Sequence, residues 1–293
     1  MPLKDKVARL PKIGAEKGRT AMSIKTILLH LADDPRNAAR IAAAIALAAR
    51  HDAHLVGLYT VSPLIVPGYI GAELPAQVYA DFEADAESKA AEAEQAFNEA
   101  VRKEGTSSEW RKERGFARDI LSAHAYYADV VVVGQPATGD DVPRGGEGLP
   151  GDLALACGRP ILAIPCVGSY PSIGRKILLA WNGSREAARA TADAMPLLTT
   201  ADEILVVTAN LRSATSAMDI ATHLARHGLK VETKNVHIDD ISIGDILINT
   251  AGENGSDLIV MGAYGHTRLN ELVFGGATRH ILKHMTVPVM MSH

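Results

Sequence analysis

The sequence predicts an α/β protein of two tandem doubly wound domains, each with a five-stranded parallel sheet and helices on both faces. Strand-like and helix-like segments alternate through both halves of the chain, from residue 25 onward. Runs such as VVVV at 130–133 and LIVM at 258–261 are apolar without alternation, which is typical of parallel strands covered on both faces. The same series of segments also occurs twice, which indicates a duplicated domain.

Four short echoes carry this duplication and keep their order along the chain. Residues 25–29 match 176–179, 36–40 match 185–189, 128–134 match 256–262, and 159–162 match 287–290. The join falls near 167–173, where Gly168, Pro171 and Gly174 interrupt the apolar pattern. We therefore expect a first domain at 23–167 and a second at 174–293, preceded by an extension at 1–22.

Each half contains five expected strands separated by helices. The first half has strands at 25–31, 54–61, 108–115, 129–134 and 160–165, and the second at 176–181, 203–210, 231–238, 257–262 and 287–291. Residues 36–51 form an Ala-rich helix. A second helix carries an apolar stripe at Val78, Phe82, Ala86, Ala93, Phe97 and Val101 and ends at Gly105. This alternation favours parallel sheets.

Composition excludes several classes of protein. The net charge of −4 offers no basic surface for nucleic acid. No apolar run approaches the roughly 20 residues that span a bilayer, so we expect no membrane segment. Cys157 and Cys166 cannot form a disulfide framework, which favours a cytoplasmic protein. The basic segment 1–22 lacks the apolar core of a secretory signal, and we expect it to be flexible.

The most informative motif is the glycine-rich stretch 262–278, GAYGHTRLNELVFGGAT. It follows the strand-like run 258–261 and leads into a helix-like run at 278–284. Backbone without a Cβ atom can approach an anion closely, and the free N–H groups of a helix start can bind it. The motif therefore predicts a site for nucleotide phosphates. The alternative is structural, because tight turns and a helix end could use the same glycines.

These residues resemble the universal stress protein family in its tandem two-domain form. Nucleotide-binding members of that family carry Gly, two residues, Gly, nine residues, Gly and then a small hydroxyl residue. Gly262, Gly265 and Gly275 have this spacing, and the resemblance covers residues 23–293. It implies the strand order 3-2-1-4-5, with strand 5 pairing domains or subunits. It also implies a stress-response sensor or switch that binds ATP or a related adenine nucleotide, with or without Mg²⁺, and that forms a homodimer.

The resemblance further implies which residues contact the nucleotide. They are Ala180, Asn182, Thr208, Gly262, Gly265, Gly275, Gly276, Ala277 and Thr278. Two of them depart from the family pattern. Gly276 replaces the hydroxyl residue that helps to hold phosphate, although Thr278 could supply a substitute. Asn182 stands where relatives commonly place Asp near the ribose and the metal, and an amide brings no charge for Mg²⁺.

The first half retains the predicted fold but lacks the glycine spacing. Gly134 is followed by Gln135, Pro136 and Ala137, so the second glycine is absent. Glu147 stands where the third glycine would fall, and its carboxylate would repel phosphate. The sequence therefore predicts that the first domain does not bind nucleotide.

Other features favour simpler interpretations. His223 and His227 lie one helical turn apart, as do His280 and His284, but neither pair has an obvious third metal ligand. Ser184 lacks a nucleophile elbow and fits a helix N-cap better. We expect no metal site and no catalytic residue. The resemblance allows slow ATP hydrolysis, but the sequence identifies no base for it.

The alternative function is an interaction module that uses dimer surfaces and the apolar loop 62–70.

Overall fold

The computed structural model describes residues 23–66, 75–135, 148–209, 215–237, 241–265 and 276–293. The first half contains β1 (Thr26–Leu31), α1 (Asn37–His51), β2 (His54–Val61), α3 (Ala76–Glu104), β3 (Ser108–Arg114), α4 (Ala117–Ala125), β4 (Val130–Gly134), α5 (Gly148–Ala156) and β5 (Ile161–Ile164). The second contains β6 (Lys176–Ala180), α6 (Arg185–Asp193), α7 (Met195–Leu198), β7 (Glu203–Ala209), α8 (Thr215–Arg226), β8 (Val231–Val236), α9 (Ile243–Asn254), β9 (Leu258–Gly262), α11 (Ala277–His284) and β10 (Val289–Ser292).

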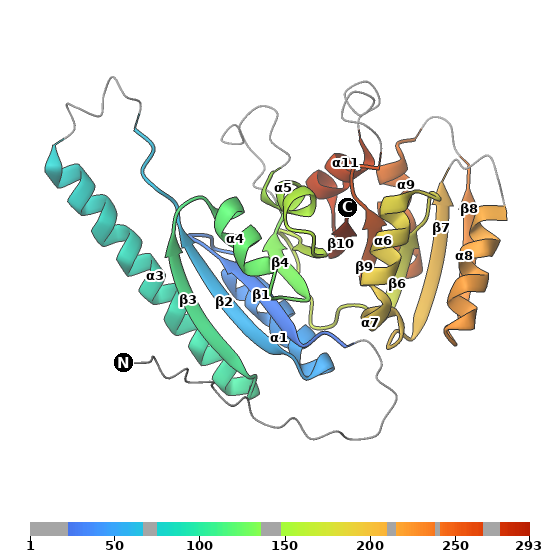
Figure 1. Cartoon of the computed structure of the whole chain (residues 1–293), viewed down its shortest axis with the longest axis horizontal. Helices are drawn as coiled ribbons and strands as arrows, with labels where there is room; N and C mark the ends of the chain where they lie inside the picture. The colour runs from blue at the N-terminus through green and yellow to red at the C-terminus, as the bar shows by residue number, and fades with distance from the viewer. Residues whose placement is uncertain (1–22, 67–74, 136–147, 210–214, 238–240, 266–275) are drawn as a thin grey trace, which may run out of the picture.

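The strands form one continuous ten-stranded sheet across the molecule (Figure 1). Its order is β3-β2-β1-β4-β5-β10-β9-β6-β7-β8, so each half has the order 3-2-1-4-5. All pairs within a half are parallel, and the halves meet where β5 and β10 pair antiparallel. The predicted fold class is confirmed, as are the strand order and the pairing through strand 5 that the resemblance implied.

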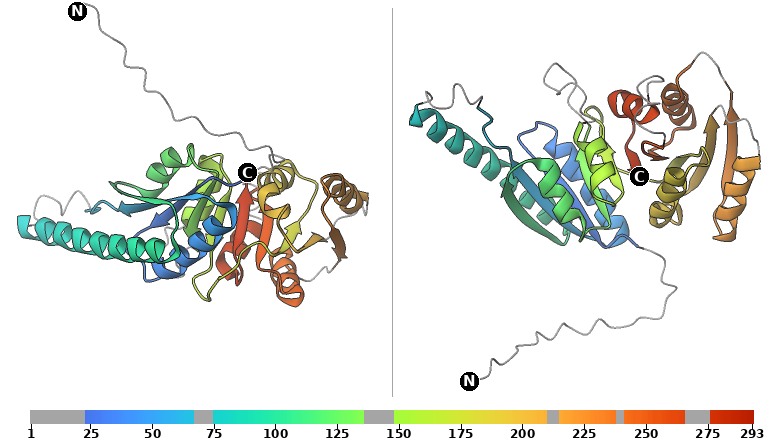
Figure 2. Two further views of the ribbon diagram at one scale, coloured as in Figure 1. Left: turned by 90° about the horizontal axis from the view of Figure 1, so that it is seen from below. Right: turned by 45° about the horizontal axis from the view of Figure 1, so that its top comes forward.

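Helices cover both faces of this sheet, as Figure 2 shows from below. Buried side chains of α1, α3, α6 and α8 pack with Leu29 on one face, and those of α4, α5, α9 and α11 pack with Leu28 on the other. Successive strand residues point to opposite faces, so both must be apolar where both faces are covered. This explains the uninterrupted apolar runs in the sequence.

The long helix α3 only partly fulfils its predicted packing. Its buried residues are Ala90, Ala93, Phe97 and Val101, all in the C-terminal half of the helix. Val78, at the start of the predicted apolar stripe, is 41% exposed. The apolar stripe is therefore buried only in the second half of the helix, which ends at Gly105 as predicted. The first turns of α3 project past the sheet in Figure 1, so they have less core to cover.

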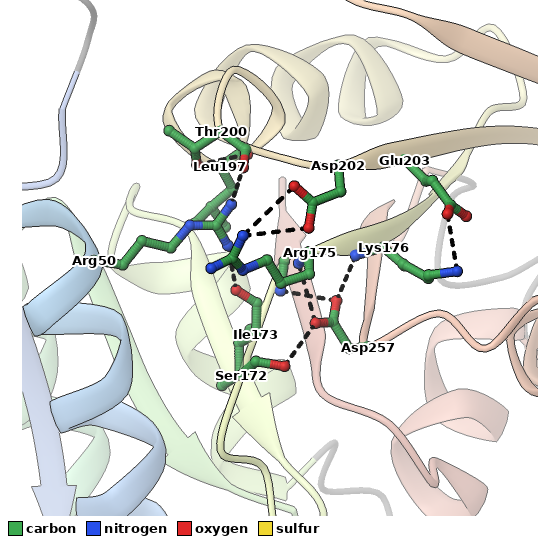
Figure 3. A network of polar contacts seen from close by, with 11 residues as sticks. Arg50, Ser172, Ile173, Arg175, Lys176, Leu197, Thr200, Asp202, Glu203 and Asp257 are labelled. Atoms are coloured by element: carbon green, nitrogen blue, oxygen red, sulfur yellow. Dashed lines mark hydrogen bonds and ion pairs between the residues drawn. The ribbon is translucent and has the colours of Figure 1, made fainter.

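Equivalent aspartates fasten the first strand of each half. Asp129 accepts hydrogen bonds from the N–H groups of Lys25 and Thr26, at 2.7 and 2.9 Å. Asp257 accepts from the N–H groups of Gly174, Arg175 and Lys176, at 2.9 to 3.0 Å (Figure 3). The echo of residues 128–134 in 256–262 therefore includes an aspartate that binds the backbone at the start of the first strand in each half.

Side chains of the first half also hold the second half in place. Arg50 on α1 donates to the carbonyl oxygens of Ile173, at 2.7 Å, and of Thr200 (Figure 3). Gln135, just after β4, donates to the carbonyl oxygen of Lys283 at the end of α11, at 3.0 Å. Together with the β5–β10 pairing, these bonds join the halves through backbone groups.

Candidate functional site

The predicted nucleotide-binding residues lie mainly where β6 and β9 end. These strands are parallel neighbours, with Ile177 opposite Leu258 and Leu179 opposite Val260. The strand order reverses between them, because β7 and β8 continue on one side and β10 on the other. Ligands of doubly wound sheets bind at such a reversal, outside the carboxyl ends of the strands. We call the region of residues 180–187, 262–265 and 276–278 the C-terminal switch point.

Asn182 and Ser184 shape the turn from β6 into α6. The side-chain oxygen of Asn182 accepts a hydrogen bond from the N–H of Ser184, at 3.1 Å. The Ser184 hydroxyl accepts one from the N–H of Ala187, at 3.1 Å, and so caps α6. The predicted N-cap is confirmed. Asn182 is exposed beside the ending strand, and its amide oxygen is already engaged in holding the turn.

Gly262 allows β9 to pack against the start of α6. A Cβ atom on Gly262 would lie 2.6 Å from the backbone nitrogen of Ala187 and 2.6 Å from the carbonyl carbon of Glu186. Any side chain would collide with this backbone, so packing alone is a sufficient reason for glycine here. This reason is structural, but it is close packing rather than the tight turn or helix end that the sequence suggested.

A left-handed residue then brings the turn to the start of α11. Tyr264 has a φ of 55°, and its N–H donates to the Thr278 hydroxyl oxygen at 3.3 Å. Such a conformation is uncommon for a residue with a side chain and is often found at functional sites. Thr278 is 4% exposed. Its hydroxyl oxygen therefore helps to shape the turn, a role that the sequence did not predict.

The start of α11 has backbone N–H groups that no side chain of its N-cap residue caps. Gly276 is the N-cap residue and forms no side-chain capping bond, and Ala277 and Thr278 follow it. The first N–H groups of a helix have no partner within the helix, and the helix dipole favours an anion there. Gly275, the third glycine of the motif, lies outside the described residues.

Sequence reasoning missed Glu186, a charged side chain that lies beside Gly265 in the described part of the glycine turn. Glu186 is 7% exposed on the first turn of α6, and its Oε2 atom lies 3.0 Å from where a Cβ atom of Gly265 would be. Burial opposes its ionisation most strongly, but hydrogen bonds from its own N–H, Ser184 and Arg185 outweigh burial and lower the pKa. An ionised carboxylate therefore faces the predicted phosphate site.

The remaining predicted contacts lie on neighbouring strands. Ala180 is half-buried at the end of β6. Thr208 on β7 is 1% exposed, and its hydroxyl donates to the side-chain oxygen of Asn235 on β8, at 3.1 Å. The hydroxyl of Thr208 is therefore committed to a neighbouring strand, although its oxygen can still accept a hydrogen bond.

The corresponding place in the first half, the N-terminal switch point, comprises residues 30–40 and 134–135. Arg40 on α1 is 3% exposed, and its Nη1 atom lies beside Gly134, where a Cβ atom would clash with it. That Nη1 donates to Asp34 at 2.5 Å, and Nη2 donates to the side-chain oxygen of Asn37. A paired guanidinium thus occupies the end of β4. Glu147, on which the prediction of repulsion depended, lies outside the described residues.

Burial changes how the two halves correspond. The sequence echo aligns Arg40 with Arg189. The buried residues of α1 at 40, 41, 44, 45 and 48 instead match the buried residues at 186, 187, 190, 191 and 194. Fourteen residues separate Ile27 from Ile41, whereas ten separate Ile177 from Ala187, so the first half has a longer connection. Arg40 therefore corresponds to Glu186, and the alignment with Arg189 is wrong.

The histidine pairs have different surroundings. His223 and His227 are exposed on α8, with ring centroids 5.0 Å apart. His280 on α11 contacts Asp245 on α9 at 2.7 Å, which fastens these two helices. In the part of the chain that the structure describes, no group of three or more His, Cys, Asp or Glu side chains could hold a metal ion. No described helix has the length and apolar character needed to cross a membrane.

Known proteins resemble this chain in sequence over one half and in fold over its whole length. Residues 174–293 match the Universal stress protein family, and no curated protein matches the sequence. A universal stress protein from Archaeoglobus fulgidus DSM 4304 superimposes with a TM-score of 0.72 at 13% identity, over 92% of this chain and 96% of that one. A functionally unknown protein from Pseudomonas aeruginosa PAO1 gives a TM-score of 0.56 at 16% identity, over 94% of each chain.

The full-length likeness extends the tandem arrangement to the first half of the chain. Residues 174–293 belong to the universal stress protein family, and the whole chain has the fold of its tandem two-domain form.

Proposed function

We propose that the C-terminal half binds ATP or a related adenine nucleotide and that the protein acts as a stress-response sensor or switch. One observation carries this proposal: the turn Gly262–Gly265 and the start of α11 meet where β6 and β9 end, joined by the bond from Tyr264 to Thr278. Backbone amides without side-chain caps then face the place where a doubly wound sheet receives its ligand.

The proposed contacts divide between the parts of a nucleotide. Gly265, Gly276 and Ala277, with Gly262 at the end of β9, would receive the phosphates. Ala180, Asn182 and Thr208 would lie along the ribose and base. Gly275 is part of this proposal through its spacing in the sequence alone. A homodimer in the cytoplasm remains part of the same proposal, and light scattering after size-exclusion chromatography would test the dimer.

The second candidate is an interaction module without a nucleotide. Two observations favour it: Glu186 brings a negative charge to the glycine turn, and Ile65, which follows β2, is 73% exposed. An exposed isoleucine is compatible with a contact to another protein. The predicted loop 62–70 extends past Val66 into residues outside the described part.

Thermal unfolding with and without ATP separates these candidates. ATP at a hundred times its dissociation constant would stabilise the wild type by about 2.7 kcal/mol. Gly265→Val would remove this stabilisation, because its side chain would enter the turn beside Glu186 and Ser184. Gly252→Val on α9 is the matched control, since a Cβ there points into open space. A wild type that ATP leaves unchanged would favour the interaction module.

A further inference from the structure

Glu186 lies inside the turn that the proposed function assigns to phosphate. A Cβ atom on Gly265 would lie 3.0 Å from its Oε2 and 3.4 Å from the hydroxyl oxygen of Ser184. The other carboxylate oxygen, Oε1, accepts from the Nε of Arg185 at 3.1 Å. Oε1 is therefore paired with Arg185, and Oε2 lies beside Gly265 of the glycine turn. The carboxylate also accepts hydrogen bonds from its own N–H and from the Ser184 side chain.

The charge of this carboxylate is only weakly offset by its partner. The Arg185 side chain is 80% exposed, whereas that of Glu186 is 9% exposed. Solvent screens an exposed guanidinium, and the N–H of Glu186 and the hydroxyl of Ser184 are neutral donors, so these contacts stabilise the carboxylate without cancelling its negative charge. A bare polyphosphate placed on the amides of Gly265 and Gly276 would meet a like charge at close range.

A divalent cation turns this repulsion into a contact. Mg²⁺ is usually held by one or two carboxylates together with substrate phosphates rather than by a complete protein cage. The switch point has this composition: one buried carboxylate, and no cluster of three or more metal-binding side chains among the described residues. Asn182 cannot replace the carboxylate, because its amide is neutral and its oxygen accepts from Ser184.

We propose that Glu186 makes polyphosphate binding at the C-terminal switch point depend on a divalent cation, which bridges its carboxylate and the phosphates. This inference rests on the proposed function. It names the bound species as a metal–nucleotide complex, and it assigns to Glu186 the charge that Asn182 lacks. Glu186 thereby acts as a specificity-determining residue that selects the metal-bound polyphosphate over the free one.

Isothermal titration with ATP, in excess Mg²⁺ or in excess EDTA, tests this inference. The wild type is expected to lose about tenfold or more in affinity when Mg²⁺ is removed. Glu186→Gln keeps the shape but removes the charge, so it should bind metal-free ATP about tenfold more tightly than the wild type. Glu186→Asp retains the charge and should retain the dependence on Mg²⁺.

Two controls isolate the charge at this position. Asp193→Asn neutralises another carboxylate of the same helix, which is paired with Arg189 at 2.8 Å, and it should behave as the wild type. Adenosine has no phosphates, so its affinity should not change with Mg²⁺ in any variant. Circular dichroism of each variant verifies that it is folded.

The possible outcomes separate this inference from the proposed function. Equal affinity of the wild type for ATP with and without Mg²⁺, unchanged in Glu186→Gln, would overturn the role of Glu186 and leave nucleotide binding intact. Absence of ATP binding by every folded variant in both buffers would overturn the inference and the proposed function together.

Discussion

The two switch points of this molecule differ in the charge that they bury. Arg40 and Glu186 occupy corresponding places, each on the helix that follows the first strand and each against the glycine that ends the fourth strand. In the first half the charge is positive and is paired internally with Asp34. In the second half it is negative and faces the glycine turn.

This difference shows that one fold can place either an internally paired charge or a charge that faces the glycine turn at the same position. At the N-terminal switch point, Nη1 of Arg40 is paired with Asp34 and Nη2 with Asn37, whereas the buried Nε of Arg40 has no hydrogen-bond partner among the described residues. The N–H of Arg36 and the guanidinium of Arg40 outweigh partial burial and lower the pKa of Asp34. At the C-terminal switch point, Oε2 of Glu186 lies beside Gly265 instead, where the proposed cation and phosphates would meet it.

Removing Arg40 is expected to have the largest effect on stability. Arg40→Ala would leave Asp34 without its partner, and breaking a buried ion pair costs roughly 3–5 kcal/mol. The Asp34 side chain is 34% exposed, so water should reduce this cost to about 2–3 kcal/mol. The midpoint of urea unfolding measures it.

The matched control for Arg40 is Arg189→Ala on α6. Its pair with Asp193 is an i,i+4 contact on a helix in which the Arg189 side chain is 50% exposed, and such contacts contribute about 0.5 kcal/mol. If the two variants destabilise the protein equally, Arg40 does not close the N-terminal switch point in the way that its burial indicates.

Alanine substitutions of Gly134, at the end of β4, and Gly262, at the end of β9, test how tightly each switch point is packed. A Cβ on Gly262 would meet backbone atoms of Ala187 and Glu186, which cannot move without shifting α6. Gly262→Ala should therefore cost about 2 kcal/mol. A Cβ on Gly134 would instead meet the guanidinium of Arg40, a side chain that can shift within its contacts to Asp34 and Asn37 without moving a helix, so Gly134→Ala should cost less. A larger loss of unfolding free energy in Gly134→Ala would contradict this ranking.

Much of the fold could be predicted from the sequence because it depends on short-range patterns. The apolar runs 130–133 and 258–261 are strands covered on both faces. The aspartates that precede them, at 129 and 257, accept hydrogen bonds from the backbone at the start of the first strand. The continuity of the sheet was implied by the resemblance. No local pattern in 160–165 or 287–291 predicts which strand lies opposite.

The electrostatics of the site could not be predicted in the same way. The glycine spacing located the turn, but the charge beside it comes from α6, some eighty residues earlier in the chain. The echo of RNAAR at 36–40 and REAAR at 185–189 aligned Arg40 with Arg189 and Asn37 with Glu186. A connection four residues longer in the first half changed that register, and only the burial pattern of the two helices shows it.

The first half should set the loss of stability in acid, because it has a buried histidine, His30, near the end of its first strand. His30 lies three residues after Ile27, at the place that Ala180 takes after Ile177. His30 is 7% exposed and contacts the Thr60 hydroxyl oxygen at 2.8 Å. Burial, and secondarily the charge of Arg40, lowers the pKa of His30 to about 3. The neutral ring therefore belongs to the folded state.

Because the unfolded histidine has a pKa near 6.5, the unfolded chain binds a proton that the folded chain does not, between about pH 6.5 and 3. Stability should fall by about 1.4 kcal/mol per pH unit as the pH drops through that window. His30→Gln removes this proton uptake, so its urea-unfolding free energy should fall less steeply from pH 6 to pH 5 than that of the wild type. Equal slopes would mean that another group sets the acid sensitivity. Burial and the charge of Arg40 would then not disfavour protonation of His30 enough to affect the unfolding free energy.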